Sequence, residues 1–145
     1  MNTAYRTGFL LNRASWSMSR KIHALLSERG MREVSVGFIG VLFSLYEQDA
    51  RKITELGELV ALEKSTMTGL LDRMEQSGLL RREPDPNDRR AYRIMLTERG
   101  KYIEGDLVGV VEEAYRQLTK DIDTDNLEKA MGVLEHIIEN ARNGS

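Results

Sequence analysis

The placement of proline is the feature that most constrains the fold of this chain. Only two of the 145 residues are proline, Pro84 and Pro86, and they lie two positions apart. A proline inside a helix removes a hydrogen bond and clashes with the preceding turn, so long proline-free stretches permit uninterrupted helices. On both sides of the proline pair, apolar residues recur at steps of three and four. The sequence therefore predicts a mainly α-helical fold, interrupted by a turn-rich segment around the prolines.

The spacing of apolar residues also predicts the order of the helices. Two long helices are expected near the ends of the chain, and two short helices directly precede the proline segment. Ser65 or Thr66 is expected to cap the second short helix, and Thr97 the helix that follows the prolines, because a hydroxyl there accepts an orphan amide hydrogen bond. The predicted helices cover residues 5–28, 36–46, 53–61, 65–76, 98 to about 118 and about 125–141, and residues 47–52 form a loop.

The proline segment itself predicts a β-hairpin, which we call the wing. Residues 79–83 and 92–96 flank it, and apolar and polar side chains alternate in the second of these runs. Alternation of this kind is typical of a half-buried strand. The connecting residues 84–90 include Arg89 and Arg90, so the tip of the wing is polar and basic. We therefore expect a fold of helices with one small two-stranded wing.

Charge is distributed unevenly along the chain, although the formal net charge is only −2. Residues 1–32 carry six basic side chains and one acidic side chain, and residues 64–93 carry seven basic and five acidic ones. Residues 94–145 carry eleven acidic side chains against six basic ones. A basic middle followed by an acidic tail suggests one face that binds an anion and another that makes a different contact.

The composition argues against several classes of protein. The chain contains no cysteine, which excludes disulfides, zinc–thiolate sites and thiol-based redox sensing. His23 and His136 are widely separated, and no histidine stands at a spacing from a serine that suggests nucleophilic catalysis. No apolar run reaches 18 residues and no signal-peptide pattern is visible. We expect a cytoplasmic protein that is not an enzyme and that holds no metal or other cofactor.

Two short helices followed by a basic-tipped hairpin are typical of proteins that bind duplex DNA. A helix fits the major groove, which is about 12 Å wide, and arginine suits the narrow, electronegative minor groove. The most specific motif runs from Asp85 to Arg90 and is followed six residues later by Leu96-Thr97-Glu98. The other characteristic segments are Thr54–Leu59, Ser65–Glu75, Gly78–Arg82 and Leu96–Gly100. On these segments the chain resembles the MarR family of bacterial winged helix-turn-helix regulators.

The resemblance implies which residues contact DNA. The second short helix is the recognition helix, and the wing arginines are oriented by an aspartate. The residues that match the family's contact positions are Ser65, Thr66, Thr68, Arg73, Asp88, Arg89 and Arg90. Gly69 departs from the pattern, because many members carry arginine there. Arg81, Arg82 and Arg93 have two possible roles: they contact DNA, or they lie on a solvated face of the hairpin. Asp72 is expected to pair with a nearby arginine.

The resemblance also implies a homodimer that grips a pseudo-palindromic operator. The winged helix-turn-helix lobe is expected at 33–97, and a helical dimerisation lobe at 1–32 and 98–145. The first and last helices each carry apolar faces that a single lobe cannot bury. The residues predicted at the dimer interface are Phe9, Leu127, Met131, Leu134 and Ile138.

A regulator of this kind is usually a repressor that is released by a small aromatic or phenolic acid. The candidate ligand-binding residues are Arg13, Trp16, Met18 and Phe38. For Trp16 and Phe38 the sequence favours packing in the core or at the dimer interface over ligand binding, and for Arg13 the opposite charges of the two chain ends favour pairing with the acidic C-terminal helices. Two other functions are open as well: a DNA-binding protein that senses no ligand, and a winged-helix protein–protein interaction module without affinity for DNA.

Overall fold

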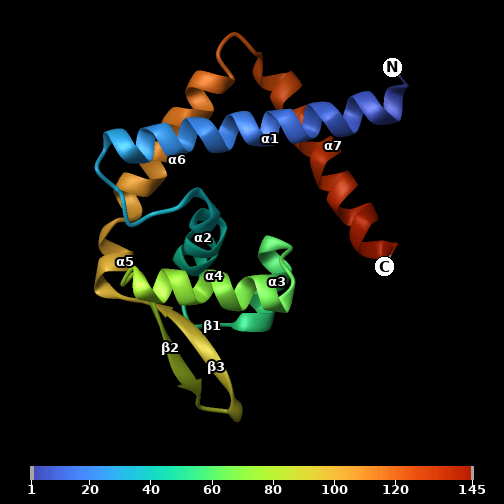
Figure 1. Cartoon of the computed structure of the whole chain (residues 1–145). Helices are drawn as coiled ribbons and strands as arrows, with labels where there is room; N and C mark the ends of the chain where they lie inside the picture. Colours follow the sequence, from blue (N-terminus) through green and yellow to red (C-terminus); the bar gives the residue numbers. More distant parts are fainter. Residues whose placement is uncertain (1, 145) are drawn as a thin grey trace. The chain divides into compact units, whose positions relative to one another are not determined.

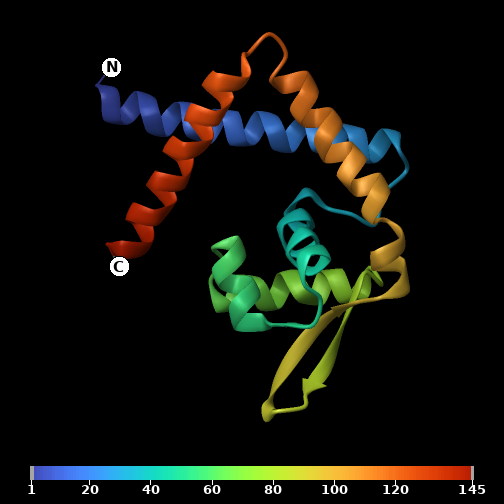
Figure 2. The same ribbon diagram turned by 180° about the vertical axis from the view of Figure 1, so that it is seen from behind.

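The computed structural model describes residues 2–144 and confirms the mainly helical fold with a small antiparallel sheet. Contacts within the chain define two compact units, Met1–Ala114 and Tyr115–Ser145. Figure 1 shows the helices and strands, and Figure 2 shows the same ribbon from behind. Within the described residues, no helix is both long enough and apolar enough to cross a membrane.

The helices before the wing follow the predicted order. Helix α1 spans Thr3–Glu28, and the side chain of its N-cap residue Asn2 accepts a hydrogen bond from the backbone N–H of Tyr5 at 3.2 Å. A 3₁₀ turn over Val36–Phe38 leads into α2 (Ile39–Glu47), and the two short helices are α3 (Ile53–Val60) and α4 (Lys64–Gln76). Gly30 and Gly78, which follow α1 and α4, both have positive φ, the conformation that glycine adopts without strain.

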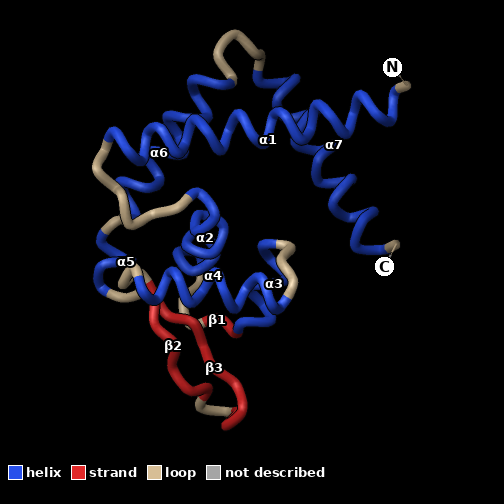
Figure 3. The backbone as a smooth tube through the Cα atoms, in the orientation of Figure 1, coloured by secondary structure: helices blue, strands red, loops and turns tan. Residues whose placement is uncertain are grey.

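The sheet has three strands, one more than the sequence predicts. Strand β1 (Arg51–Lys52) and strand β2 (Leu80–Asp85) both pair antiparallel with the central strand β3 (Asp88–Leu96). Figure 3 shows β2 and β3 in red, forming the wing that extends away from the helices. The wing strands include most of the segment 84–90 that the sequence assigns to a turn, so only Pro86 and Asn87 connect them.

Three helices follow the wing. Thr97 caps α5 (Glu98–Tyr102) as predicted, since its hydroxyl accepts a hydrogen bond from the N–H of Gly100 at 3.0 Å. The expected long helix is interrupted at Ile103, and α6 continues over Glu104–Leu118. Asp123 caps the last helix, α7 (Thr124–Asn143), by accepting from the N–H of Asn126 at 2.9 Å.

The hydrophobic core fixes the two short helices and the base of the wing to each other. It draws buried side chains from the C-terminal half of α1, from α2, α3, α4 and the wing base, from Ile103 between α5 and α6, and from α6. Full burial of a side chain such as Leu or Met contributes about 1.5–3 kcal/mol. The largest fully buried side chains are those of Leu26, Leu42, Leu45, Leu56, Met67, Leu71, Met74, Leu79, Leu80, Ile94, Leu107 and Val41.

The start of α4 corrects a second prediction. Neither Ser65 nor Thr66 caps this helix, because it begins one residue earlier, at Lys64, and Glu63 is the N-cap. The carbonyl of Glu63 accepts the first helical hydrogen bond, from the N–H of Met67 at 2.9 Å. Ser65 and Thr66 are therefore exposed on the first turn of α4.

Two helices of the chain expose long apolar faces. Every residue of α1 from Thr3 to Ser17 is exposed, including the large side chains of Phe9 and Trp16. No residue of α7 is buried. The large apolar side chains that α7 exposes are Met131, Val133, Leu134, Ile137 and Ile138.

Candidate nucleic-acid interface

The exposed side of α4 carries the short polar side chains predicted to contact DNA. Met67, Leu71 and Met74 are fully buried and hold the opposite side of the helix on the core. Ser65, Thr66 and Thr68 are exposed, and the Thr68 hydroxyl lies against the helix backbone, donating to the carbonyl of Lys64 at 3.0 Å. Small side chains held close to the helix leave the backbone of α4 accessible to a close approach by a partner.

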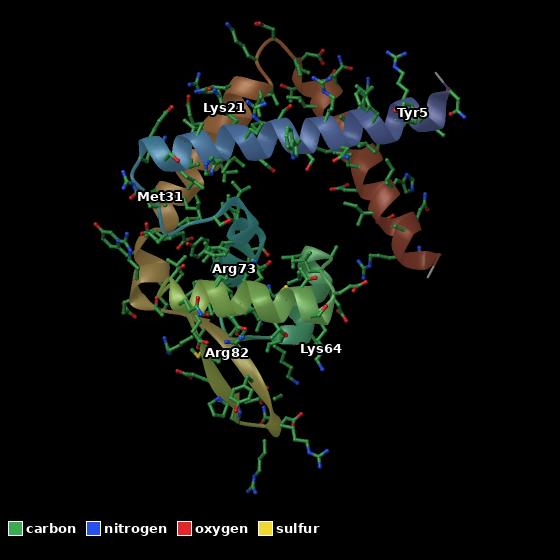
Figure 4. The ribbon with its side chains drawn as sticks, viewed as in Figure 1. Tyr5, Lys21, Met31, Lys64, Arg73 and Arg82 are labelled. Atoms are coloured by element: carbon green, nitrogen blue, oxygen red, sulfur yellow. The ribbon has the colours of Figure 1, made fainter. Side chains whose placement is uncertain are left out.

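Arg73 adds positive charge to this side of α4. Its side chain is exposed, and its Nη1 lies 3.8 Å from the point where a Cβ on Gly69 would stand. Because Gly69 has no side chain, the surface of α4 is open one turn before Arg73. The Arg73 guanidinium lies beside this open position. Figure 4 labels Arg73 and Lys64 on α4.

The tip of the wing is shaped by two aspartates. The Asp85 carboxylate accepts a hydrogen bond from the backbone N–H of Asn87 at 2.8 Å, and the Asp88 carboxylate accepts from the backbone N–H of Arg90 at 2.9 Å. Asp88 therefore acts on the backbone of Arg90, and the side chains of Arg89 and Arg90 are exposed at the tip.

Asp85 also anchors the tip to the body of the wing, a role that the sequence analysis missed. Its carboxylate is fully buried and pairs with the Nε of Arg93 at 3.0 Å. The hydrogen bond from Asn87 and then the pairing with Arg93 hold the pKa of Asp85 below its ordinary value of 3.8. The sequence does show that Asp85 stands eight residues before Arg93, on the other strand of the predicted hairpin. It does not show that the Asp85 carboxylate is buried.

The structure separates the arginines of α4 and the wing into two groups. Arg81 pairs with Glu83 at 2.7 Å, Arg82 pairs with Asp72 at 2.7 Å, and Arg93 pairs with Asp85. The prediction that Asp72 pairs with an arginine is thus confirmed. Among the described ion pairs, none involves Arg73, Arg89 or Arg90. Among the six described arginines of α4 and the wing, the three without an acidic partner are therefore the three in the predicted DNA-contacting set.

Tyr92 is a further exposed residue of the wing that the sequence analysis did not assign to the site. It pairs across the hairpin with Pro84 and is half exposed. Successive side chains of a strand point to opposite faces, so Arg90, Tyr92 and Ile94 share one face of the wing. Tyr92 places an apolar ring between the arginine at the tip and the core.

The candidate ligand-binding residues do not gather at one place. Phe38 is buried in the core, at 4% exposure, whereas Arg13 and Trp16 are exposed on α1. Arg13 lies over the ring of Phe9, 5.7 Å from its centroid. An open hollow of about 560 Å³ lies beside Trp16, and its lining is Trp16, Ser19, Arg20, His23, Ser35 and Val36.

Comparison with known proteins identifies the family. The model of the MarR family matches residues 39–92, which include α2, α3, α4 and most of the wing. The HTH-type transcriptional regulator YsmB of Bacillus subtilis is 32% identical over 127 residues, covering 81% of this chain and 86% of YsmB. The chain belongs to the MarR family. Its members are transcriptional regulators rather than enzymes.

Solved structures show the same fold. A MarR transcriptional regulator from Methanosarcina mazei superposes with a TM-score of 0.82 at 21% identity, covering all of this chain and 94% of that one. A mutant MarR from E. coli, complexed with operator DNA, superposes with a TM-score of 0.81 at 24% identity, covering 90% of this chain and 91% of that one. The MarR fold therefore extends over both compact units of the chain.

Proposed function

We propose that this MarR-family protein is a homodimer that binds duplex DNA through α4 and the wing. The observation that supports this most directly is that, among the arginines of α4 and the wing, three have no acidic partner in the described structure. Arg73 lies on the exposed side of α4, and Arg89 and Arg90 lie at the tip of the wing. Cations that are not neutralised within the protein are available to phosphates, which supply most of the affinity of proteins for DNA.

The two elements would perform different tasks on the duplex. The recognition helix α4 presents Ser65, Thr66 and Thr68, whose short polar side chains suit base edges in the major groove. The wing presents Arg89 and Arg90, whose long side chains suit phosphates and a narrow minor groove. The solved MarR–operator complex supports DNA as the partner of this fold.

Dimerisation would double these contacts. The apolar faces of α1 and of α7 are exposed within a single chain, and a second copy is the partner that we propose for them. Residues 33–97 would form the DNA-binding lobe, and residues 1–32 and 98–145 the dimerisation lobe. The two-fold symmetry of a dimer maps onto the DNA, so the operator would be pseudo-palindromic with half-sites about 10–10.5 bp apart.

The experiment that tests this proposal is a footprint on the DNA upstream of the protein's own gene. We expect protection of two symmetric half-sites by the wild-type protein. A footprint that covers a single asymmetric half-site would contradict the dimeric mode of binding. Absence of any protected site in a genome-wide selection of bound fragments would contradict DNA binding.

We further propose that the protein is a cytoplasmic repressor that responds to a small aromatic or phenolic acid. The hollow beside Trp16 and Arg20 offers an aromatic surface and a cation to such a ligand. The two DNA-binding lobes of the dimer must be correctly spaced to fit the operator. A ligand that binds more tightly to a dimer with a different spacing would shift the population away from the DNA-bound form. A panel of salicylate-like acids should raise the melting temperature and release DNA; if no compound does either, the ligand proposal fails and DNA binding stands.

A winged-helix module for protein–protein interaction is the second candidate. It would be favoured if the exposed side of α4 and the wing tip were acidic or neutral. The unpaired cations Arg73, Arg89 and Arg90 favour the nucleic-acid partner instead.

A further inference from the structure

One arginine of the wing reaches back to the recognition helix. Arg82 lies on β2, opposite Ile94 of β3, and it is two positions after Leu80 on the same face of the strand. Leu80 and Ile94 are buried in the core, so the side chain of Arg82 leaves the wing toward α4. Figure 4 labels Arg82 near the base of the wing, close to α4.

Three hydrogen bonds join Arg82 to α4. Its Nη2 donates to Asp72 Oδ1 at 2.7 Å, and its Nη1 donates to Glu75 Oε2 at 2.5 Å. The backbone N–H of Arg82 donates to Glu75 Oε1 at 3.2 Å. Both the backbone and the guanidinium of one strand residue are thus held by two carboxylates that are three residues apart on one helix.

The same two carboxylates stand close to the proposed DNA-contacting side of α4. Asp72 follows Thr68 by four residues, so the two side chains share a face of the helix. Two carboxylates at that place would repel phosphates, and Arg82 neutralises one of the two charges. The Arg82 side chain is only 21% exposed, which limits its own access to a phosphate.

We propose that Arg82 is a positioning residue that holds the wing at a fixed angle to the recognition helix. This inference rests on the proposed function. A duplex has a fixed distance between its major groove and the adjacent minor groove. Arg90 at the wing tip and Thr68 on α4 contact the same DNA molecule together only if the wing is held at the matching angle. Arg82 sets this angle through its hydrogen bonds to Asp72 and Glu75. It thereby determines whether the wing contributes to the affinity for DNA.

The test is a double-mutant cycle between Arg82 and Arg90. We measure operator affinity for the wild type, Arg82→Gln, Arg90→Ala and the double variant. Arg82→Gln alone should weaken binding at least about fivefold. In its background, Arg90→Ala should weaken binding less than twofold further, because a wing at the wrong angle no longer places Arg90 on the DNA. Arg82→Lys should restore only part of the affinity, since an ammonium does not reproduce the two-pronged pairing of a guanidinium.

Arg81→Gln is the matched control. Arg81 is the adjacent residue, points to the other face of the strand and pairs with Glu83. Its effect should be additive with that of Arg90→Ala. Thermal unfolding shows whether each variant is folded, and a substitution of a surface ion pair costs about 1 kcal/mol or less.

Two results would overturn the inference while DNA binding by the wild type stands. Additive effects of Arg82→Gln and Arg90→Ala would show that the two arginines act independently. Full recovery of affinity by Arg82→Lys would show that charge alone matters and geometry does not. A wild-type protein that does not bind the operator would instead refute the proposed function.

Discussion

At the scale of single residues, Gly100 has the tightest surroundings of any glycine in the described chain. A Cβ at this position would lie 2.1 Å from the carbonyl oxygen of Leu79, a backbone atom that cannot move aside without displacing the base of the wing. Replacing Gly100 by alanine should therefore destabilise the protein by about 1–3 kcal/mol or more, as overpacked positions do. Denaturant unfolding measures this change.

Gly105 is the matched control for that prediction. It lies on α6, and no atom stands within 4 Å of a Cβ built on it. Gly105→Ala should stabilise the protein by up to about 1 kcal/mol through helix propensity. Equal effects of the two substitutions would contradict the close approach of Leu79 to Gly100.

Tyr46 gives a prediction for alkaline pH. Its hydroxyl donates to the carbonyl of Gly100 at 3.0 Å, and burial, followed by the charge of Glu104, raises its pKa from 10.0 to about 12. A raised pKa means that the neutral form is favoured in the folded protein. The resulting stability is complete below pH 10 and is lost as the pH rises from 10 to 12.

Tyr46→Phe should therefore reduce the alkaline decline of stability between pH 10 and 12. At pH 7 the variant should lose about 1 kcal/mol, the contribution of one hydrogen bond. Tyr5→Phe, which removes an exposed tyrosine hydroxyl on α1, is the matched control substitution. If wild type and Tyr46→Phe decline in parallel, the assigned pKa is wrong.

At the scale of elements, the contacts of Asp85 predict that its pairing with Arg93 keeps the tip of the wing well ordered. Asp85→Asn removes a buried carboxylate that binds both the Asn87 N–H and the Arg93 guanidinium. We expect faster amide hydrogen exchange at the wing tip and no change in α4. Because the pKa of Asp85 is lowered, wild-type protection at the tip should be present above pH 3.8 and decline below it.

Glu83→Gln serves as the control for the wing, because its partner Arg81 is 45% exposed and such surface pairs contribute little. Should Asp85→Asn leave hydrogen exchange at the tip unchanged, the buried ion pair would not be what orders the wing.

Periodicity predicts the helices well and the short elements poorly. The four apolar residues of α4, which are Met67, Leu70, Leu71 and Met74, are spaced as one helix face, and all are buried. The sequence did not predict strand β1, because two residues are too few to show an alternation of apolar and polar side chains. Its pairing with β3 identifies it as a strand. The start of α4 was misplaced because a hydroxyl residue is a common cap, whereas here Glu63 precedes the first turn.

The chemistry of the site was predictable only in part for a related reason. Arg89 and Arg90 are recognisable from a motif, but the separation of paired from unpaired arginines depends on which carboxylates the folded wing and α4 bring within reach of each guanidinium. Arg82 and Asp72 are ten residues apart and meet because the wing folds back beside α4. Sequence spacing alone does not show which arginine is neutralised.

At the scale of the whole molecule, the exposed apolar faces predict association. Leu134 and Ile138 are one helical turn apart on α7, and they are 43% and 58% exposed. Changing both to lysine should abolish dimerisation and DNA binding together, because each half-site contact alone is weak. Sedimentation at micromolar concentration checks the state of association. Tyr102→Lys on α5, at 76% exposure and not among the predicted interface residues, should leave both properties intact. A wild-type protein that sediments as a monomer would contradict the dimer.

The measurement that tests the central proposal most directly is affinity against salt, for the operator and a random duplex. Each neutralised phosphate contributes about −0.9 to the log–log salt slope, and a dimer carries each arginine twice. Arg90→Ala should therefore flatten the slope by up to about two units and weaken binding to both duplexes alike. Thr68→Ala should leave the slope nearly unchanged and relax one or two operator positions. An Arg90→Ala protein with unchanged affinity and unchanged slope would contradict the assignment of the wing to DNA and would favour a protein partner instead.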